Sequence, residues 1–218
     1  KVGLLSADCD IEAIIDEMKP WYDNYCFAKE CLESNIRVFN CDMVMYYLRS
    51  FVSRGHAPEI MLDPNTKTDY NKLKGLIKLD KLDGDRKGVM LEIIEKGEIK
   101  ATLVPSFSAM EMTKPEIFPS LLFYYGMLTI TGTRGSRVIL GIPNNNVRKQ
   151  YYNYILEVYD KLGNHVNILK LKDFFDIMAF DGNWRGCLQY MADCYKNLSS
   201  VRDSIEGERN IQGFFLAY

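Results

Sequence analysis

The spacing of apolar positions changes twice between residues 117 and 155, and each change marks a new element. An apolar run over residues 117–125 stops at Gly126, a residue suited to the left-handed conformation that ends many helices. Apolar and smaller residues then alternate in two short stretches, which is the period of a half-buried strand. The apolar members of these stretches are Met127, Leu128, Ile130, Val138, Leu140 and Ile142.

Turn and cap residues separate these stretches. Gly132 to Gly135 predicts a tight hairpin turn, and Asn144 to Asn146 offer capping side chains to a helix that begins near Val147. The order helix, hairpin, helix predicts the closing half of a winged-helix-like module. Modules of that kind usually bind DNA or another protein.

The chain before this module predicts two amphipathic helices. The first carries Ile11, Ile14, Ile15 and Met18 on one face and is expected to stop before Pro20, and the second passes through Val44, Leu48 and Phe51. Residues 1–60 are therefore interpreted as the helical end of a larger domain.

The middle block, residues 61–160, contains the winged-helix-like module. A helix capped by Thr68, a helix over 85–96 and a strand over 98–104 are expected to precede it. Thr113 to Glu116 matches a capping box, while Pro119 requires the following helix to kink or to restart. Residues 161–218 predict further helices, so the fold class is mainly α with a small β hairpin.

Several phrases in the chain resemble a known family. They are WYDNYCFAKE followed by RVFN, DPNTKTDYNKLKGLIKLDKLDGDRKGV, PEIFPSLLFYYGMLTITG, VILGIPNNNVRKQYYNYIL and ERNIQGFFLAY. Together they look like the bacterial AAA-ATPase-like proteins that carry a C-terminal PD-(D/E)XK nuclease-like domain. Where that family commonly has glycine in a Tyr-Asp-Gly-Tyr run, this chain has Asn24, which tolerates a left-handed backbone.

The resemblance implies a position between two catalytic domains. An ATPase core would precede residues 1–60, and a nuclease-like core would follow residues 208–218. ATP and a divalent metal would then belong to the parent protein, with no cofactor in this chain. The flanking domains would be its partners, and the expected location is cytoplasmic.

The amino-acid composition is typical of a folded protein. The chain has 218 residues, of which 47% are hydrophobic and 26% charged, enough to bury a sizeable core. It begins at Lys1 without methionine, which suggests a fragment of a longer protein. No apolar run is long enough to span a bilayer, and the six cysteines show no disulfide framework, so reduced thiols are expected.

The net charge of −2 limits the electrostatic case for nucleic acid binding. The candidate basic patch contains Arg134, Arg137, Arg148 and Lys149, in a span without Asp or Glu from 134 to 151. An ordinary solvated surface is the preferred interpretation, and DNA contact is the alternative.

Catalytic motifs are missing from the sequence. The chain has no phosphate-binding loop, because the glycines at 132–135 lack the lysine and helix that such a loop needs. Asp85, Glu98 and Lys100 imitate the spacing of a nuclease metal site, and we interpret this as accidental. Cys26, Cys31, Cys41 and His56 have irregular spacings, which favours packing over zinc binding. We therefore expect neither a catalytic residue nor a metal site.

Aromatic residues cluster at 21–27. Trp21, Tyr22, Tyr25 and Phe27 could stack on bases, but large buried rings more often anchor one domain against another. We therefore expect a non-catalytic connector that couples an ATPase core to a nuclease-like domain, with DNA contact through the hairpin left open. The alternative is a protein–protein interaction module without nucleic-acid contact.

Overall fold

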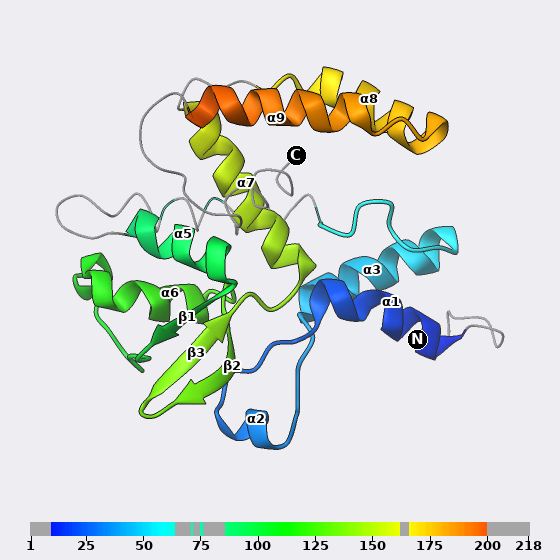
Figure 1. Cartoon of the computed structure of the whole chain (residues 1–218). Coiled ribbons are helices and arrows are strands. Elements are labelled where there is room, and N and C mark those ends of the chain that lie inside the picture. Colours follow the sequence, from blue (N-terminus) through cyan, green and yellow to red (C-terminus); the bar gives the residue numbers. More distant parts are fainter. Residues whose placement is uncertain (1–9, 64–70, 72–74, 76–85, 162–165, 200–218) are drawn as a thin grey trace. The chain divides into compact units, whose positions relative to one another are not determined.

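The fold was obtained as a computed structural model that describes residues 10–63, 71, 75, 86–161 and 166–199 (Figure 1). Helices predominate, and they accompany a single three-stranded antiparallel sheet within the described ranges, which confirms the expected mainly α class. The chain falls into two compact units, residues 1–148 and 149–218, which are described separately. The boundary lies within helix α7 (Asn145–Lys161). The predicted division at residues 60 and 160 stays a prediction.

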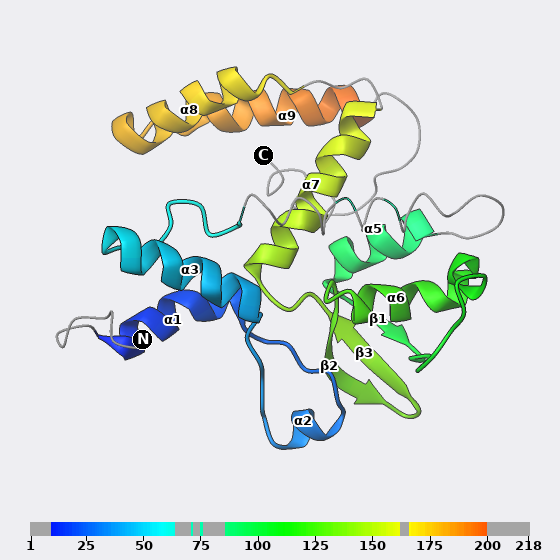
Figure 2. The ribbon, with the colours of Figure 1, turned by 180° about the vertical axis from the view of Figure 1, so that it is seen from behind.

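Two helices begin the first unit. Helices α1 (Ile11–Tyr22) and α3 (Cys41–Arg54) lie side by side in both views, and the short α2 (Glu30–Glu33) comes between them in sequence (Figures 1 and 2). The Asp10 side chain caps α1 and the Asn40 side chain caps α3, each by accepting a hydrogen bond from a first-turn backbone amide. Helix α3 ends at Gly55, whose φ is +80°.

The expected end of the first helix before Pro20 is wrong. Helix α1 continues through Pro20 to Tyr22. A proline removes one backbone hydrogen bond and crowds the carbonyl four residues earlier. Because Pro20 lies in the last turn, the helix loses only that one bond, and the burial of Tyr22 holds the turn in place.

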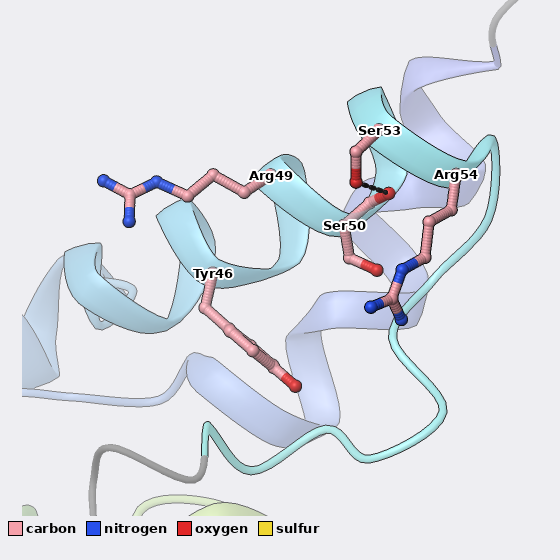
Figure 3. A pocket seen from close by; sticks show the side chains of 5 residues that line it. All are labelled: Tyr46, Arg49, Ser50, Ser53 and Arg54. Atoms are coloured by element: carbon pink, nitrogen blue, oxygen red, sulfur yellow. Dashed lines mark hydrogen bonds between the residues drawn. The ribbon is translucent and has the colours of Figure 1, made fainter.

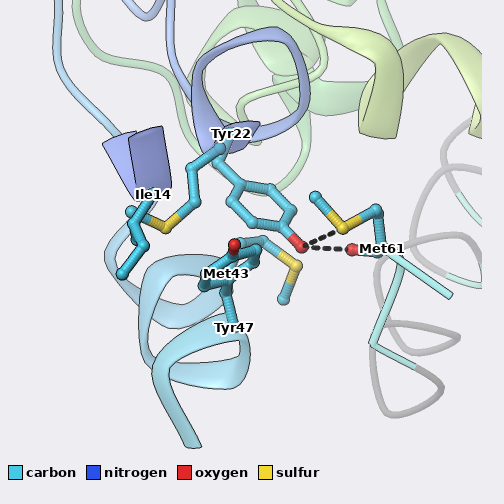
Figure 4. Close-up of a cluster of buried hydrophobic side chains, with 6 residues drawn as sticks. Ile14, Tyr22, Met43, Tyr47 and Met61 are labelled. Atoms are coloured by element: carbon cyan, nitrogen blue, oxygen red, sulfur yellow. Dashed lines mark hydrogen bonds between the residues drawn. The ribbon is translucent and has the colours of Figure 1, made fainter. Parts of the chain in front are cut away.

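A compact core forms between α1 and α3 (Figure 4). The Tyr22 and Tyr47 rings meet edge to face with their centroids 6.5 Å apart, and the Tyr22 hydroxyl donates a 2.6 Å hydrogen bond to the carbonyl of Met61. The segment after α3 is thereby fastened to α1. The buried members of this core are Ile14, Met18, Tyr22, Met43, Tyr47 and Met61.

The sheet has the strand order β1-β3-β2. Helix α5 (Arg86–Lys96) leads into β1 (Glu98–Ala101), and α6 (Phe118–Tyr124) leads into the hairpin of β2 (Thr129–Arg134) and β3 (Arg137–Gly141). Figure 2 shows β3 between the other two strands. Helix α7 follows, so the predicted order of helix, hairpin and helix is confirmed.

The hairpin turn lies later than predicted. Gly132 and Arg134 belong to β2, and the chain turns at Gly135 and Ser136. A register shift between Ile130 and Gly132 inserts an extra residue, and Gly135, with φ +61°, supplies the positive φ that a two-residue hairpin turn needs at its first position. Two other local expectations are confirmed: Gly126 has φ +71°, and the Asn144 side chain accepts the Val147 amide hydrogen bond.

The helix expected to begin at Thr113 to Glu116 begins later in the chain, at Phe118. A 3-10 turn, η2 (Glu111–Thr113), is followed by a second, η3 (Pro115–Ile117), for which Lys114 is the N-cap without a side-chain hydrogen bond. Helix α6 then begins at Phe118, with Pro119 in its first turn. The helix therefore restarts, because proline is tolerated where a helix has no backbone amide bond to lose.

The segment 24–27 is bonded to the hairpin. The Cys26 amide donates to the Thr129 hydroxyl at 2.6 Å, and the Ile130 amide donates to the Cys26 carbonyl at 3.1 Å. On its other side, Tyr25 pairs with Val38 through two backbone hydrogen bonds. Asn24 has φ +76°, as expected of a residue that replaces glycine in this turn. These bonds extend the sheet beyond the β2 edge.

The second unit contains the helices α8 (Ile168–Asp181) and α9 (Arg185–Ser199), which pack against each other. Asn167 caps α8 by accepting the Lys170 amide hydrogen bond, and Gly182, with φ +69°, ends it. Helices were expected in this part of the chain. The helix predicted after Thr68 and the last part of the helical stretch predicted over 161–218, from residue 200 on, lie outside the described residues.

Candidate functional site

The aromatic residues predicted to form an anchor divide between two places in the first unit. Tyr22 is fully buried in the core of α1 and α3, and Trp21 packs against the same core. Burial raises the pKa of the Tyr22 hydroxyl, with a smaller contribution from the Glu17 carboxylate. Tyr22 therefore stays protonated and serves as a hydrogen-bond donor inside the core.

Tyr25 and Phe27 instead lie beside helix α6. The Tyr25 and Phe27 rings stack with centroids 5.6 Å apart, and Phe27 contacts the edge of Phe123 at 5.7 Å. Phe123 contacts Tyr124 at 5.3 Å, and Tyr124 contacts Phe107 at 6.0 Å. Five rings from three separate stretches of sequence thus form a continuous series, which we call the aromatic ladder.

One side of the aromatic ladder faces solvent. Phe27 is 51% exposed and Tyr124 is 50% exposed, and the neighbouring Tyr125 is 47% exposed, whereas Phe123 is buried. Contiguous exposed aromatic surface is a common mark of a protein interaction site. Exposed tyrosine and phenylalanine rings bury much area on binding for little loss of side-chain entropy. The aromatic ladder is therefore the leading candidate for a binding surface.

The sequence did not predict that Phe107 and Tyr124 belong to the aromatic ladder or that Tyr124 and Tyr125 are exposed. The run from Ile117 to Tyr125 was interpreted only as the apolar face of a helix. In the structure, Phe118, Leu121 and Leu122 fill the buried face, and the adjacent tyrosines project from the last turn. Two tyrosines at a helix end, next to a terminating glycine, are a signal of this arrangement, because a tyrosine hydroxyl is accommodated more readily at the surface than in an apolar core.

The hairpin brings two of the four predicted basic residues together. Arg134 and Arg137 are direct cross-strand partners on either side of the turn, and both are exposed. Directly opposed residues point to the same face of the hairpin, with Cβ atoms only about 5 Å apart. Like charges in that position repel each other, and an anion between the two guanidinium groups would relieve the repulsion.

The other two basic residues lie elsewhere. Arg148 is in the first turns of α7, where its guanidinium donates to the Asn145 side chain at 3.1 Å. Strand β3 separates it from Arg137, and Lys149 is the next residue of α7. Arg148 therefore does not join the hairpin pair. An extended strand covers about 3.3 Å per residue, so the length of β3 alone is about 13 Å.

The described residues give little support to a nuclease metal site formed by Asp85, Glu98 and Lys100. Glu98 and Lys100 are exposed on β1, on the face opposite to the buried Ile99 and Ala101. Asp85 lies outside the described residues. Across the described ranges, no cluster of three His, Cys, Asp or Glu side chains could hold a metal ion. The expectation of no catalytic site stays a prediction.

The cysteines of the first unit differ in their surroundings. Cys26 is buried, with its thiol 3.2 Å from the Ala28 carbonyl, and burial raises its thiol pKa. Cys31 is half-buried and Cys41 is exposed. His56 is exposed and its Nδ1 lies 2.7 Å from the Ala57 carbonyl. A raised thiol pKa disfavours the thiolate that metal binding requires.

Comparisons with protein-family models, with curated proteins and with solved structures gave no match for this chain. The resemblance to AAA-ATPase-like proteins therefore stays a prediction from the quoted sequence phrases. None of the helices in the described ranges has the length and apolar character needed to cross a membrane.

Proposed function

We propose that this chain is a non-catalytic connector that binds a neighbouring folded domain through the exposed side of the aromatic ladder. The carrying observation is the series of ring contacts that runs from Phe27 through the buried Phe123 to Tyr124, in which Phe27 and Tyr124 are each half-exposed. The ring stacking fixes their orientation before binding, so little ordering entropy is lost on association.

The topology supports a winged-helix-like module within this connector. The described elements run helix α5, strand β1, helix α6 and hairpin β2-β3, with β1 beside β3. In a DNA-binding module of this kind, the helix before the hairpin would enter the major groove and present polar side chains to the bases. Here α6 buries five residues, and no charged residue occurs from Ile117 to Thr133. That composition supports protein binding by this helix.

The proposal includes the coupling role implied by the resemblance. In the longer protein to which the resemblance points, the connector would pass movements between an ATPase core and a nuclease-like domain. The bonds between Cys26 and the residues at the start of β2 support mechanical coupling, because they tie the helical start of the unit to the hairpin.

Hydrogen exchange of backbone amides tests this function. We compare the 218-residue chain with the protein encoded by the complete reading frame. Amides at 27–28 and 123–126 are expected to be protected more strongly in the longer protein. The substitutions Phe27→Ser and Tyr124→Ser should remove this protection, whereas Val52→Ser, at a comparably exposed apolar position on α3, should not. Equal exchange at these amides in both proteins would contradict the proposal.

The hairpin arginines favour a second candidate function, which is contact with the DNA backbone. Arg134 and Arg137 are opposed at the exposed end of the sheet, and a phosphate group can accept hydrogen bonds from guanidinium groups of opposite charge. The segment from 134 to 151 contains no acidic residue that would repel a phosphate. The net charge of −2 gives little general attraction, so any such binding would depend on this pair.

A further inference from the structure

The second half of helix α3 carries a polar pocket that neither proposed function uses. Its volume is about 230 Å³, and its lining residues are Tyr46, Arg49, Ser50, Ser53 and Arg54 (Figure 3). Residues three or four positions apart share one side of a helix, so these five side chains form a single stripe. The loop after α3 closes one side, because the Tyr46 hydroxyl donates a 2.9 Å hydrogen bond to the Ile60 carbonyl.

The charges at the pocket are mainly positive. Arg49 and Arg54 are exposed, and neither guanidinium forms an ion pair or hydrogen bond with another described residue. Burial raises the pKa of the Tyr46 hydroxyl. The Asp63 carboxylate raises this pKa further, and the Arg54 guanidinium lowers it. Among the described residues, two guanidinium groups thus oppose the Asp63 carboxylate near the pocket, which favours an anionic ligand over a neutral or cationic one.

The hydroxyl groups add donors beside these charges. The Ser50 hydroxyl oxygen is buried and has no hydrogen-bond partner among the described residues, which is costly for a buried polar atom. The Ser53 hydroxyl donates to the Ser50 carbonyl at 3.1 Å. In Figure 3, the Ser50 hydroxyl and the Arg54 guanidinium extend toward the loop that follows the helix, while Arg49 extends away from them.

We propose that this pocket binds the phosphate group of a small soluble ligand. The planar guanidinium of Arg54 can donate two parallel hydrogen bonds to a phosphate, and the Ser50 hydroxyl can donate a third. Arg49 contributes charge from the other side of the stripe. The pocket lies in the C-terminal half of α3, where free carbonyl groups carry partial negative charge, so the side chains supply the attraction.

Amide chemical shifts of the 218-residue chain, followed during titration with inorganic phosphate and with phenyl phosphate, test the site. Saturable shifts are expected at residues 46–54 with both probes, and equal ionic strength of sodium chloride should not produce them. Tighter binding of phenyl phosphate would identify the ligand as a phosphate ester, and tighter binding of inorganic phosphate would identify it as free phosphate. Acetate binding as tightly as phosphate would overturn the phosphate assignment.

Substitutions in the pocket test whether Arg54 and Ser50 bind the phosphate that causes the amide chemical-shift changes. Arg54→Gln should weaken phosphate binding about tenfold, the effect of losing one charged hydrogen-bonding partner. Ser50→Ala removes a hydroxyl that has no hydrogen-bond partner among the described residues, so it should weaken binding and leave folding intact. Lys29→Gln removes one exposed positive charge next to α2, in the same unit but outside the pocket lining, and should leave binding unchanged. Unaltered affinity in both Arg54→Gln and Ser50→Ala would refute the site, as would shifts that never saturate.

Discussion

The backbone amide of Cys26 donates a 2.6 Å hydrogen bond to the side-chain hydroxyl of Thr129, although 103 residues separate them in the chain. Thr129 is buried, and its hydroxyl also lies 3.2 Å from the Cys26 carbonyl. The Thr129 side chain thus supplies the acceptor for the Cys26 amide, beside the backbone bond from the Ile130 amide to the Cys26 carbonyl. It joins the helical start of the first unit to its sheet.

This contact predicts a specific loss of stability. Thr129→Val keeps the shape of the side chain but leaves the buried Cys26 amide without its acceptor, which should lower the free energy of unfolding by about 1–3 kcal/mol. Chemical denaturation of the chain measures this difference. Thr131→Val provides the control, because the Thr131 hydroxyl bonds to the Ile139 carbonyl at an exposed position and should matter little. Equal stability of the two variants would show that the Cys26 contact is energetically unimportant.

We expect the buried Tyr22 hydroxyl to lower the free energy of unfolding at alkaline pH. Its buried hydroxyl has a raised pKa, so the folded chain keeps a proton that the unfolded chain releases above about pH 10. The free energy of unfolding therefore falls as the pH rises through this range. Tyr22→Phe should be less stable at neutral pH by about 1 kcal/mol, because it loses the bond to Met61, but should lose less stability above pH ~10.

Denaturation curves collected between neutral and alkaline pH test this prediction. Tyr124→Phe is the matched control, because Tyr124 is half-exposed and should change neither the stability nor its pH dependence. Parallel pH profiles for the native chain and Tyr22→Phe would exclude Tyr22 as a source of the alkaline loss.

The opposed arginines predict how the hairpin would bind DNA. If Arg134 and Arg137 contact phosphates, duplex binding should be weak, salt-sensitive and tolerant of sequence. Replacing both by alanine should reduce the slope of log affinity against log salt by about 0.9 for each lost contact. Titration of a labelled duplex at two salt concentrations measures the slope, with Lys172→Ala as a control for loss of charge. Identical slopes for the native chain and the double variant would remove the hairpin from DNA contact.

The sequence and the exposed Glu98 and Lys100 predict that the purified chain hydrolyses neither DNA nor nucleoside triphosphates. Incubation with plasmid DNA and Mg²⁺ or Mn²⁺, and separately with ATP, measures both activities. Metal-dependent cleavage that disappears in Glu98→Ala would contradict this expectation and would make β1 part of an active site. Glu116→Ala, at an exposed carboxylate outside β1, is the control.

Local signals in the sequence predicted most of the elements correctly. Gly126 ended a helix, Asn144 capped a helix, and alternating apolar residues formed the hairpin. These outcomes depend on backbone preferences and short-range hydrogen bonds, which a few neighbouring residues decide. The errors at Pro20 and at the hairpin turn arose where distant contacts or an inserted residue changed the local preference.

The sequence by itself determined the mainly helical class, the order of helix, hairpin and helix, and the lack of a phosphate-binding loop. Only the tertiary structure decided which side chains became neighbours. It joined Phe27 to Phe123, opposed Arg134 to Arg137, and buried Tyr22 against Met61. The physical reason is that periodicity specifies which face of an element is apolar, whereas long-range packing and strand register specify what that face meets.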